Sequence, residues 1–118
     1  MAQLKTKDGN PKPEPTCFQY GDNPRLGFTF ELGEKHEIFA PHSFLSRIEM
    51  KNGDEICFHY TYGVVQIIGR NLHEIFGRIK GQSIGGFRPS DPDDPCRVEI
   101  EIRKIVFKDA KAEMLASI

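Results

Sequence analysis

Cys57 and His59 are the residues of this chain best suited by type to metal binding or nucleophilic catalysis, and they lie two positions apart. In a strand this spacing places both side chains on one face. Zinc sites usually take ligand pairs from tight turns such as CxxC, and the other candidates, His42 and Cys96, form no second close pair. The pattern therefore predicts no metal site. Two interpretations of Cys57 and His59 remain open. They are candidates for a metal centre or a Cys–His nucleophile, or they are a solvent-facing histidine and a small apolar thiol.

A second kind of chemistry, anion binding, is suggested where Gly69-Arg70-Asn71-Leu72 passes from a strand into a helix. The first N–H groups of a helix have no partner within it and can hold a phosphate or a carboxylate. The segment lacks the glycine spacing of GxGxxG and of the P-loop. The hypothesis therefore depends on Arg70 beside the helix start.

Nucleic-acid binding is a related hypothesis, because small β-barrels that bind single strands combine cations with aromatic rings on which bases stack. The predicted anion- or nucleic-acid-binding residues are Arg47, Tyr62, Arg70, Asn71 and Lys80. Glutamates are spread through the same strands, and 16 basic and 17 acidic residues leave a formal net charge of -1. This balance argues against a dedicated polyanion binder.

The element that positions several of these residues is a helix predicted over 71–80. Asn71 is a favoured N-cap residue, and Glu74 three positions later completes an Asx version of the capping box. Gly81 is predicted to end the helix in the left-handed conformation. The apolar residues that recur at helical spacing are Leu72, Ile75, Phe76 and Ile79.

Before this helix the chain alternates apolar and polar residues, as half-buried strands do. Residues 26–32 and 35–39 are predicted to form a hairpin that ends at Pro41. Residues 44–68 are predicted to form a three-stranded meander, with a three-residue first loop in which Gly53 is left-handed, and a second turn centred on Tyr62-Gly63. The expected cross-strand pairs are Ile48 with Ile56, Phe44 with Tyr60, Tyr60 with Val65, and Phe58 with Ile67.

After the helix the pattern predicts a short strand over 83–88, an acidic loop over 89–95 and a last strand over 97–107. The apolar parity of the last strand changes near Arg103 and Lys104, which predicts a β-bulge there. The final KDAKAEMLASI is rich in helix formers, but the sequence identifies no face on which such a helix would pack.

Length and composition predict one domain over 17–108, between a disordered arm over 1–16 and a tail over 109–118. No apolar run is long enough to span a bilayer, and the N-terminus has no signal-peptide h-region. The odd number of cysteines fits reduced thiols. We therefore expect a cytoplasmic protein with no membrane association and no cofactor.

The segment VVQIIGRNLHEIF resembles a strand–GRNL–helix stretch of short uncharacterised bacterial proteins. That resemblance implies no activity and no residue roles. The predicted architecture is also similar to Sm-like and pleckstrin-homology-like small barrels, but it departs from both because its helix is internal rather than first or last.

These observations predict an α+β fold: a mainly antiparallel curved sheet or a small, partly open β-barrel of about six strands, with the amphipathic helix packed on it. We expect a non-enzymatic binding or interaction module that self-associates or binds another protein, because strand edges near 83–88 and 98–107 lack partners. The alternative is a small β-barrel that binds RNA or single-stranded DNA. The second alternative is a small metal-binding protein or enzyme around Cys57 and His59.

Overall fold

The structure is a computed structural model that describes residues 17–19, 26–94, 96 and 99–110. The arm predicted over 1–16 and the last eight residues lie outside this part of the chain. The described elements, in order, are β1 (Phe18–Gln19), β2 (Gly27–Gly33), β3 (His36–Pro41), η1 (His42–Phe44), β4 (Leu45–Lys51), β5 (Glu55–Tyr60), β6 (Gly63–Arg70), α1 (His73–Lys80), β7 (Gly86–Phe87) and β8 (Glu101–Asp109).

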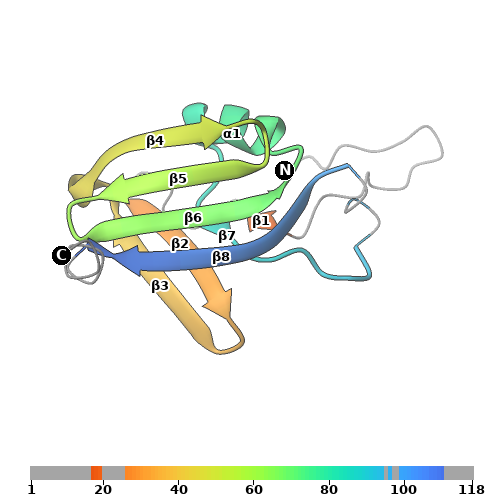
Figure 1. Cartoon of the computed structure of the whole chain (residues 1–118), viewed down its shortest axis with the longest axis horizontal. Helices are drawn as coiled ribbons and strands as arrows, with labels where there is room; N and C mark the ends of the chain where they lie inside the picture. The colour runs from red at the N-terminus through yellow and green to blue at the C-terminus, as the bar shows by residue number, and fades with distance from the viewer. Residues whose placement is uncertain (1–16, 20–25, 95, 97–98, 111–118) are drawn as a thin grey trace, which may run out of the picture.

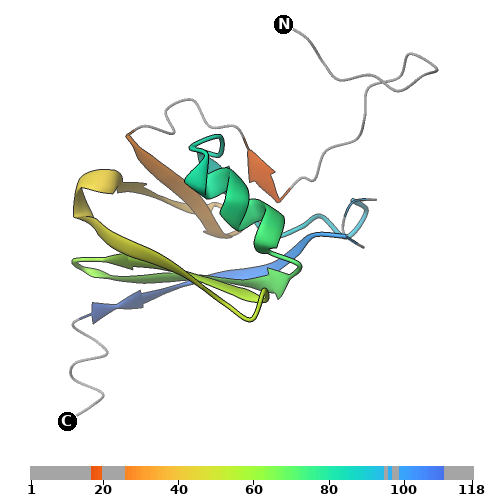
Figure 2. The same cartoon turned by 90° about the horizontal axis from the view of Figure 1, so that it is seen from above.

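The strands form two four-stranded sheets, in the orders β1-β7-β2-β3 and β4-β5-β6-β8. All neighbouring strands are antiparallel except β2 and β7, which are parallel. Figure 1 shows the first sheet behind the second, and Figure 2 shows α1 at an open side of this sandwich. The α+β prediction is confirmed. The strands form two sheets that do not close into a barrel, whereas the prediction was one sheet or barrel of about six strands.

Phenylalanine rings join the two sheets. Phe28 and Phe30 of β2 and Phe87 of β7 are buried against Phe58 of β5, which is 0% exposed. The centroid of the Phe58 ring lies 4.9 Å from that of Phe30 and 5.3 Å from that of Phe28. Such edge-to-face contacts stabilise a core by about 1 kcal/mol per pair beyond the area they bury.

The meander has the predicted strands but a different register. Ile48 pairs with Phe58, and Phe58 pairs with Val65, so three of the four predicted pairings are displaced by two residues. The fourth differs, because Tyr60 pairs with Leu45 beside a bulge and not with Phe44. The first loop has the predicted length of three residues and a left-handed Gly53, but it consists of Asn52, Gly53 and Asp54 and not of residues 51–53. The second turn is Thr61-Tyr62 and not Tyr62-Gly63. Because the two-residue displacement is even, the predicted side chains still face the core, except that Leu45 takes the place of Phe44, which is exposed.

The predicted bulge in β8 is confirmed. Ile68 pairs with Lys104 and Gly69 pairs with Ile102, which leaves Arg103 as the extra residue. The backbones approach so closely here that a Cβ on Gly69 would lie 1.9 Å from the Glu101 carbonyl oxygen. Glycine is therefore required at position 69 for the close approach of the two strands.

The predicted unpaired edge near 83–88 is wrong. The strand in this region is β7, and it lies inside its sheet, between β1 and β2. β8 is at the edge of the other sheet and, within the described residues, pairs only with β6. Its charged residues are Glu101, Arg103, Lys104, Lys108 and Asp109. Charges along an edge strand oppose strand-to-strand association.

The helix is confirmed, but the prediction that Asn71 caps its N-terminus is wrong. α1 begins at His73, and its N-cap residue, Leu72, makes no side-chain cap hydrogen bond. Asn71 is left-handed, with φ 56°, and its side-chain amide donates to the Glu99 carbonyl oxygen at 2.7 Å. The Leu72 N–H donates to the Gly53 carbonyl oxygen, so contacts with two other loops set the start of the helix.

The helix end also differs from the prediction, because Gly81 has φ -82° and Gln82 has φ 58°. The Ser83 N–H donates to the Arg78 carbonyl oxygen at 3.1 Å, and the Gln82 N–H donates to that of Ile79 at 3.0 Å. These two bonds form a Schellman motif with Gln82 in its left-handed position. The helix nevertheless buries the predicted stripe, although Phe76 stays half-buried.

Replacing Gln82 with glycine should stabilise the protein by about 1 kcal/mol, because glycine adopts positive φ without the cost that a Cβ imposes. The matched change Gly81→Ala should alter stability by less than about 0.5 kcal/mol, since position 81 has negative φ and room for a Cβ. Urea unfolding of both variants measures the two effects. The reverse order, with Gly81→Ala the damaging change, would place the left-handed residue at 81.

Candidate functional site

Cys57 and His59 lie on the outer face of β5, each beside a different carboxylate. The Cys57 thiol donates to Glu55 Oε2 at 3.1 Å. His59 Nε2 lies 2.6 Å from Glu49 Oε1 on the neighbouring strand β4. The predicted outer face is confirmed for both, but Cys57 is only 2% exposed.

The surroundings of Cys57 disfavour its thiolate. Burial raises the pKa of the Cys57 thiol, and the hydrogen bond to Glu55 raises it further. A nucleophilic cysteine needs the opposite environment, one that favours the thiolate. Among the described residues no group of three or more potential ligands is placed to hold a metal ion. The surroundings of Cys57 and His59 among the described residues therefore do not support a metal site or a nucleophilic cysteine here.

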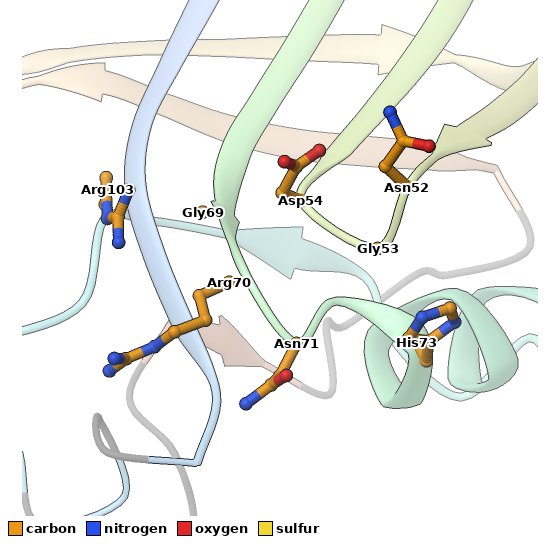
Figure 3. Close-up of a pocket in the computed structure, with 8 residues that line it drawn as sticks. All are labelled: Asn52, Gly53, Asp54, Gly69, Arg70, Asn71, His73 and Arg103. Atoms are coloured by element: carbon orange, nitrogen blue, oxygen red, sulfur yellow. The ribbon is translucent and has the colours of Figure 1, made fainter.

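A shallow pocket of about 300 Å³ lies at the start of α1, where the β4–β5 turn, the end of β6 and β8 meet (Figure 3). Its lining residues are Asn52, Gly53, Asp54, Gly69, Arg70, Asn71, His73 and Arg103. Arg70 and Arg103 both approach Glu101 Oε1, at 3.6 Å and 3.4 Å. Figure 3 shows Arg70 extending toward β8 and away from His73. The pocket is thus of mixed charge, and its arginines lie beside a carboxylate.

The predicted anion-binding residues do not form one site. Arg70 and Asn71 line the pocket together, whereas Tyr62 precedes the other end of β6, roughly 25 Å away at the rise of a strand. Arg47 lies on the outer face of β4, 3.7 Å from Glu49. Lys80 lies at the far end of α1, with its Nζ 5.1 Å from the centre of the Phe76 ring.

Exposed apolar side chains, in contrast, gather at one end of the sandwich. The large hydrophobic residues that are exposed in the described part of the chain are Leu26 (61%), Phe39 (52%), Phe44 (48%) and Tyr62 (38%). We call these four residues the apolar end. It lies where the chain passes from β3 through η1 to β4 and where the turn from β5 to β6 follows, at the left of Figure 1.

Short contacts hold the parts of the apolar end together. The Thr61 N–H donates to the Phe44 carbonyl oxygen at 2.9 Å, and the Phe44 and Tyr62 ring centroids are 6.1 Å apart. The His42 N–H donates to the Leu26 carbonyl oxygen, which places Leu26 beside η1. Phe39 lies over Gly27, because a Cβ there would lie 2.7 Å from Phe39 Cζ.

Tyr60 and Tyr62 extend this cluster toward the core. Their rings are stacked, with centroids 5.4 Å apart and planes at 8°. Within the described residues the buried Tyr60 hydroxyl has no hydrogen-bond partner. Burial raises the pKa of Tyr60, and the neighbouring Tyr62 adds to the effect, so this phenol stays neutral at physiological pH. A buried polar group without a partner destabilises the fold, so the apolar end is not optimised for stability alone.

Sequence reasoning identified Tyr62 as a stacking ring but missed the apolar end as a surface. Strand alternation placed Leu26 and Phe44 on core faces, yet both lie just beyond a strand, where the opposite sheet no longer covers them. The available signal was the position of the two residues at predicted strand ends.

Comparisons with models of protein families, with curated protein sequences and with solved structures found no match. Across the described residues, α1 is too short and too polar to cross a membrane, and no other helix there is capable of it.

Replacing Glu55 with glutamine should make stability less dependent on pH in acid. Hydrogen bonds from Cys57 and Gln66 lower the pKa of Glu55 below its ordinary value of 4.5. A carboxyl with a lowered pKa stabilises the fold above its unfolded pKa, and this stabilisation is lost as pH falls through the folded pKa.

We therefore expect Glu55→Gln to be less stable than the wild type at about pH 7, and the difference to shrink between about pH 5 and pH 3. Urea unfolding at each pH measures the free energy of unfolding of both proteins. A difference that persists undiminished at the acidic end would show that the charge of Glu55 does not stabilise the folded state.

Proposed function

We propose that this protein is a non-enzymatic interaction module that self-associates through the apolar end. The observation that carries the proposal is the apolar end itself, where four large apolar side chains are exposed. The other large apolar side chains of the described residues are buried or half-buried. Contiguous exposed apolar surface on a small domain is typical of interaction sites. Aromatic residues are enriched in such interfaces.

The composition of the sheet edges also supports this placement of the interface. β8 carries five charged residues of its nine, and β4 carries Arg47, Glu49 and Lys51. Pairing between such edges brings charges together and strips them of water, so it is less favourable than burial of aromatic rings. These charges support the apolar end, and not the strand edges that motivated the sequence-based expectation, as the proposed interface.

Replacing Phe44 or Tyr62 with serine should weaken self-association by about tenfold or more, because aromatic anchors contribute a large share of interface energy. Sedimentation velocity over a range of concentrations measures the dissociation constant. The matched control is His73→Ser, an exposed position on α1 in the pocket near the opposite end of β6.

Circular dichroism and urea unfolding verify that each variant is folded. A wild-type protein that stays monomeric at every concentration would contradict the proposal, as would an equal loss of association in the control.

A second candidate function is binding of single-stranded nucleic acid at the same end. Tyr62 presents an exposed ring, and the next cross-strand row on the outer face joins Arg47, His59, Val64 and Lys108. The row places a cation at each end of the outer face, where a strand's phosphates meet positive charge, whereas the Tyr62 ring packs on Tyr60 and Phe107 of the inner face, so a bound strand has to pass around the end of the sheet to reach both. Glu49 beside Arg47 weakens that field.

This candidate predicts that a fluorescent oligonucleotide binds with an affinity that falls steeply with salt. Replacing both Arg47 and Lys108 with glutamine should lower the slope of log K against log salt by about two. The control is Arg70→Gln, which should leave the slope unchanged because Arg70 lies at the other end of β6. Fluorescence anisotropy is the measurement, and absent or salt-independent binding would exclude this function.

A further inference from the structure

We propose that β3 of one copy pairs antiparallel with β3 of a second copy, around a two-fold axis at Phe39. The pairing joins the two β1-β7-β2-β3 sheets into one sheet that is continuous across the axis. This inference rests on the proposed function, because it assigns the geometry by which the apolar end meets a second copy. It is carried by the direction of the backbone groups of β3 and by the charges of the strand.

β3 is the outer strand of its sheet, and among the described residues it pairs only with β2. Of its six residues, Glu37 alone is an acidic or basic residue other than histidine. The edge strand β4, in contrast, carries three such residues of seven, and β8 carries five of nine. Figure 1 shows the β2–β3 hairpin extending past β8. An exposed edge strand with little charge is the kind that pairs with another chain.

Two backbone hydrogen bonds show which groups of β3 point to this free edge. Residue pairs of an antiparallel ladder alternate between pairs that exchange hydrogen bonds and pairs that do not. The His42 N–H donates to the Leu26 carbonyl oxygen at 2.9 Å, so the even-numbered residues of β3 are the ones bonded to β2. The Thr29 N–H donates to the Gly85 carbonyl oxygen at 2.9 Å, away from its cross-strand partner Phe39. The odd-numbered residues of β3 therefore direct their backbone groups outward.

These outward groups fit an extended strand as the partner. Glu37 and Phe39 each present an N–H and a C=O, whereas Pro41 presents only its C=O. Another strand satisfies groups that alternate in this way. Because both copies present odd-numbered residues, the registers that bring Glu37 and Phe39 against the other strand are centred on Glu37, Ile38 or Phe39.

The side chains favour the register centred on Phe39. A centre on Glu37 sets two carboxylates opposite each other, and a centre on Ile38 sets each Phe39 ring opposite a carboxylate. A centre on Phe39 instead pairs two aromatic rings on one face and Ile38 with Ala40 on the other, which stabilises the ladder. Each Glu37 then lies opposite Pro41 of the other copy, and the two carboxylates are roughly 14 Å apart along the strands.

Phe39 connects this pairing to the apolar end. Its ring lies over Gly27, the cross-strand partner of Pro41, and remains 52% exposed. Contact with the second copy buries this ring. Because both copies use the same strand, the contact closes at a dimer.

Amide hydrogen exchange, followed by NMR on the full chain, tests the pairing directly. The amides of Ile38 and Ala40 are bonded to β2, whereas those of Glu37 and Phe39 point outward and gain acceptors only in the pair. At a concentration where about nine-tenths of the chains are associated, exchange at Glu37 and Phe39 should slow by about tenfold. Ile38 and Ala40 serve as internal controls. Association without this protection would overturn the inference and leave the proposed function standing.

Charged variants at position 39 test the register. Phe39→Lys and Phe39→Glu each set two like charges opposite each other, so each variant alone should associate about tenfold more weakly than the wild type in sedimentation velocity. An equal mixture of the two should recover association, because opposite charges then face each other. The same changes at His73, an exposed position on α1, are the matched controls and should have no effect, alone or mixed. Tighter association of Phe39→Lys alone would overturn this register, since it would place residue 39 opposite Glu37.

Circular dichroism verifies that each variant is folded. A wild-type protein that stays monomeric at every concentration would defeat the inference together with the proposed function. Protection of Glu37 and Phe39, combined with unchanged association of Phe44→Ser and Tyr62→Ser, would support the β3 pairing and reject the wider apolar end as the interface.

Discussion

The packing of phenylalanine rings between the two sheets is the interaction on which the rest of this structure depends. Phe30 and Phe87 are stacked, with ring planes at 16° and centroids 5.5 Å apart, and both rings pack against Phe58 of the opposite sheet. β7 has only two residues, too few for a strand that is stabilised by its ladder alone. It keeps its place between β1 and β2 because Phe87 is buried in this cluster.

The same sandwich explains why one end of the molecule remains apolar. A ring on a strand is covered only where the opposite sheet extends over it, and Phe44 and Tyr62 lie in connections beyond that limit. Phe44 packs on Tyr62, and Tyr62 stacks on the buried Tyr60, so the core continues outward as an exposed aromatic surface.

The outer face of the meander serves a different purpose. There Glu55 accepts hydrogen bonds from Cys57 and Gln66, and Glu49 lies against His59. The Cys57–Glu55 bond lies within β5, and the other two pairs connect neighbouring strands. Together these hydrogen bonds lower the pKa of both carboxyls. The residue types that suggested chemistry in the sequence therefore contribute to the hydrogen bonds of the sheet surface.

Local patterns in the sequence were sufficient to predict the hairpin, the meander, the helix and the last strand in their order, but not β1 or η1. The parity of apolar residues identified the meander, the stripe of the helix, and even the extra residue Arg103 in β8, because side-chain direction follows from spacing along one segment. Register, caps and sheet partners were decided only in the tertiary structure. From Arg47 onward the two-residue displacement in the meander preserves the face of each side chain, so parity cannot detect it. Asn71 leaves its capping role because the Glu99 carbonyl, far along the chain, accepts its amide. The place of β7 and the apolar end likewise depend on where one sheet stops covering the other, which is a property of contacts between distant segments and of no single segment.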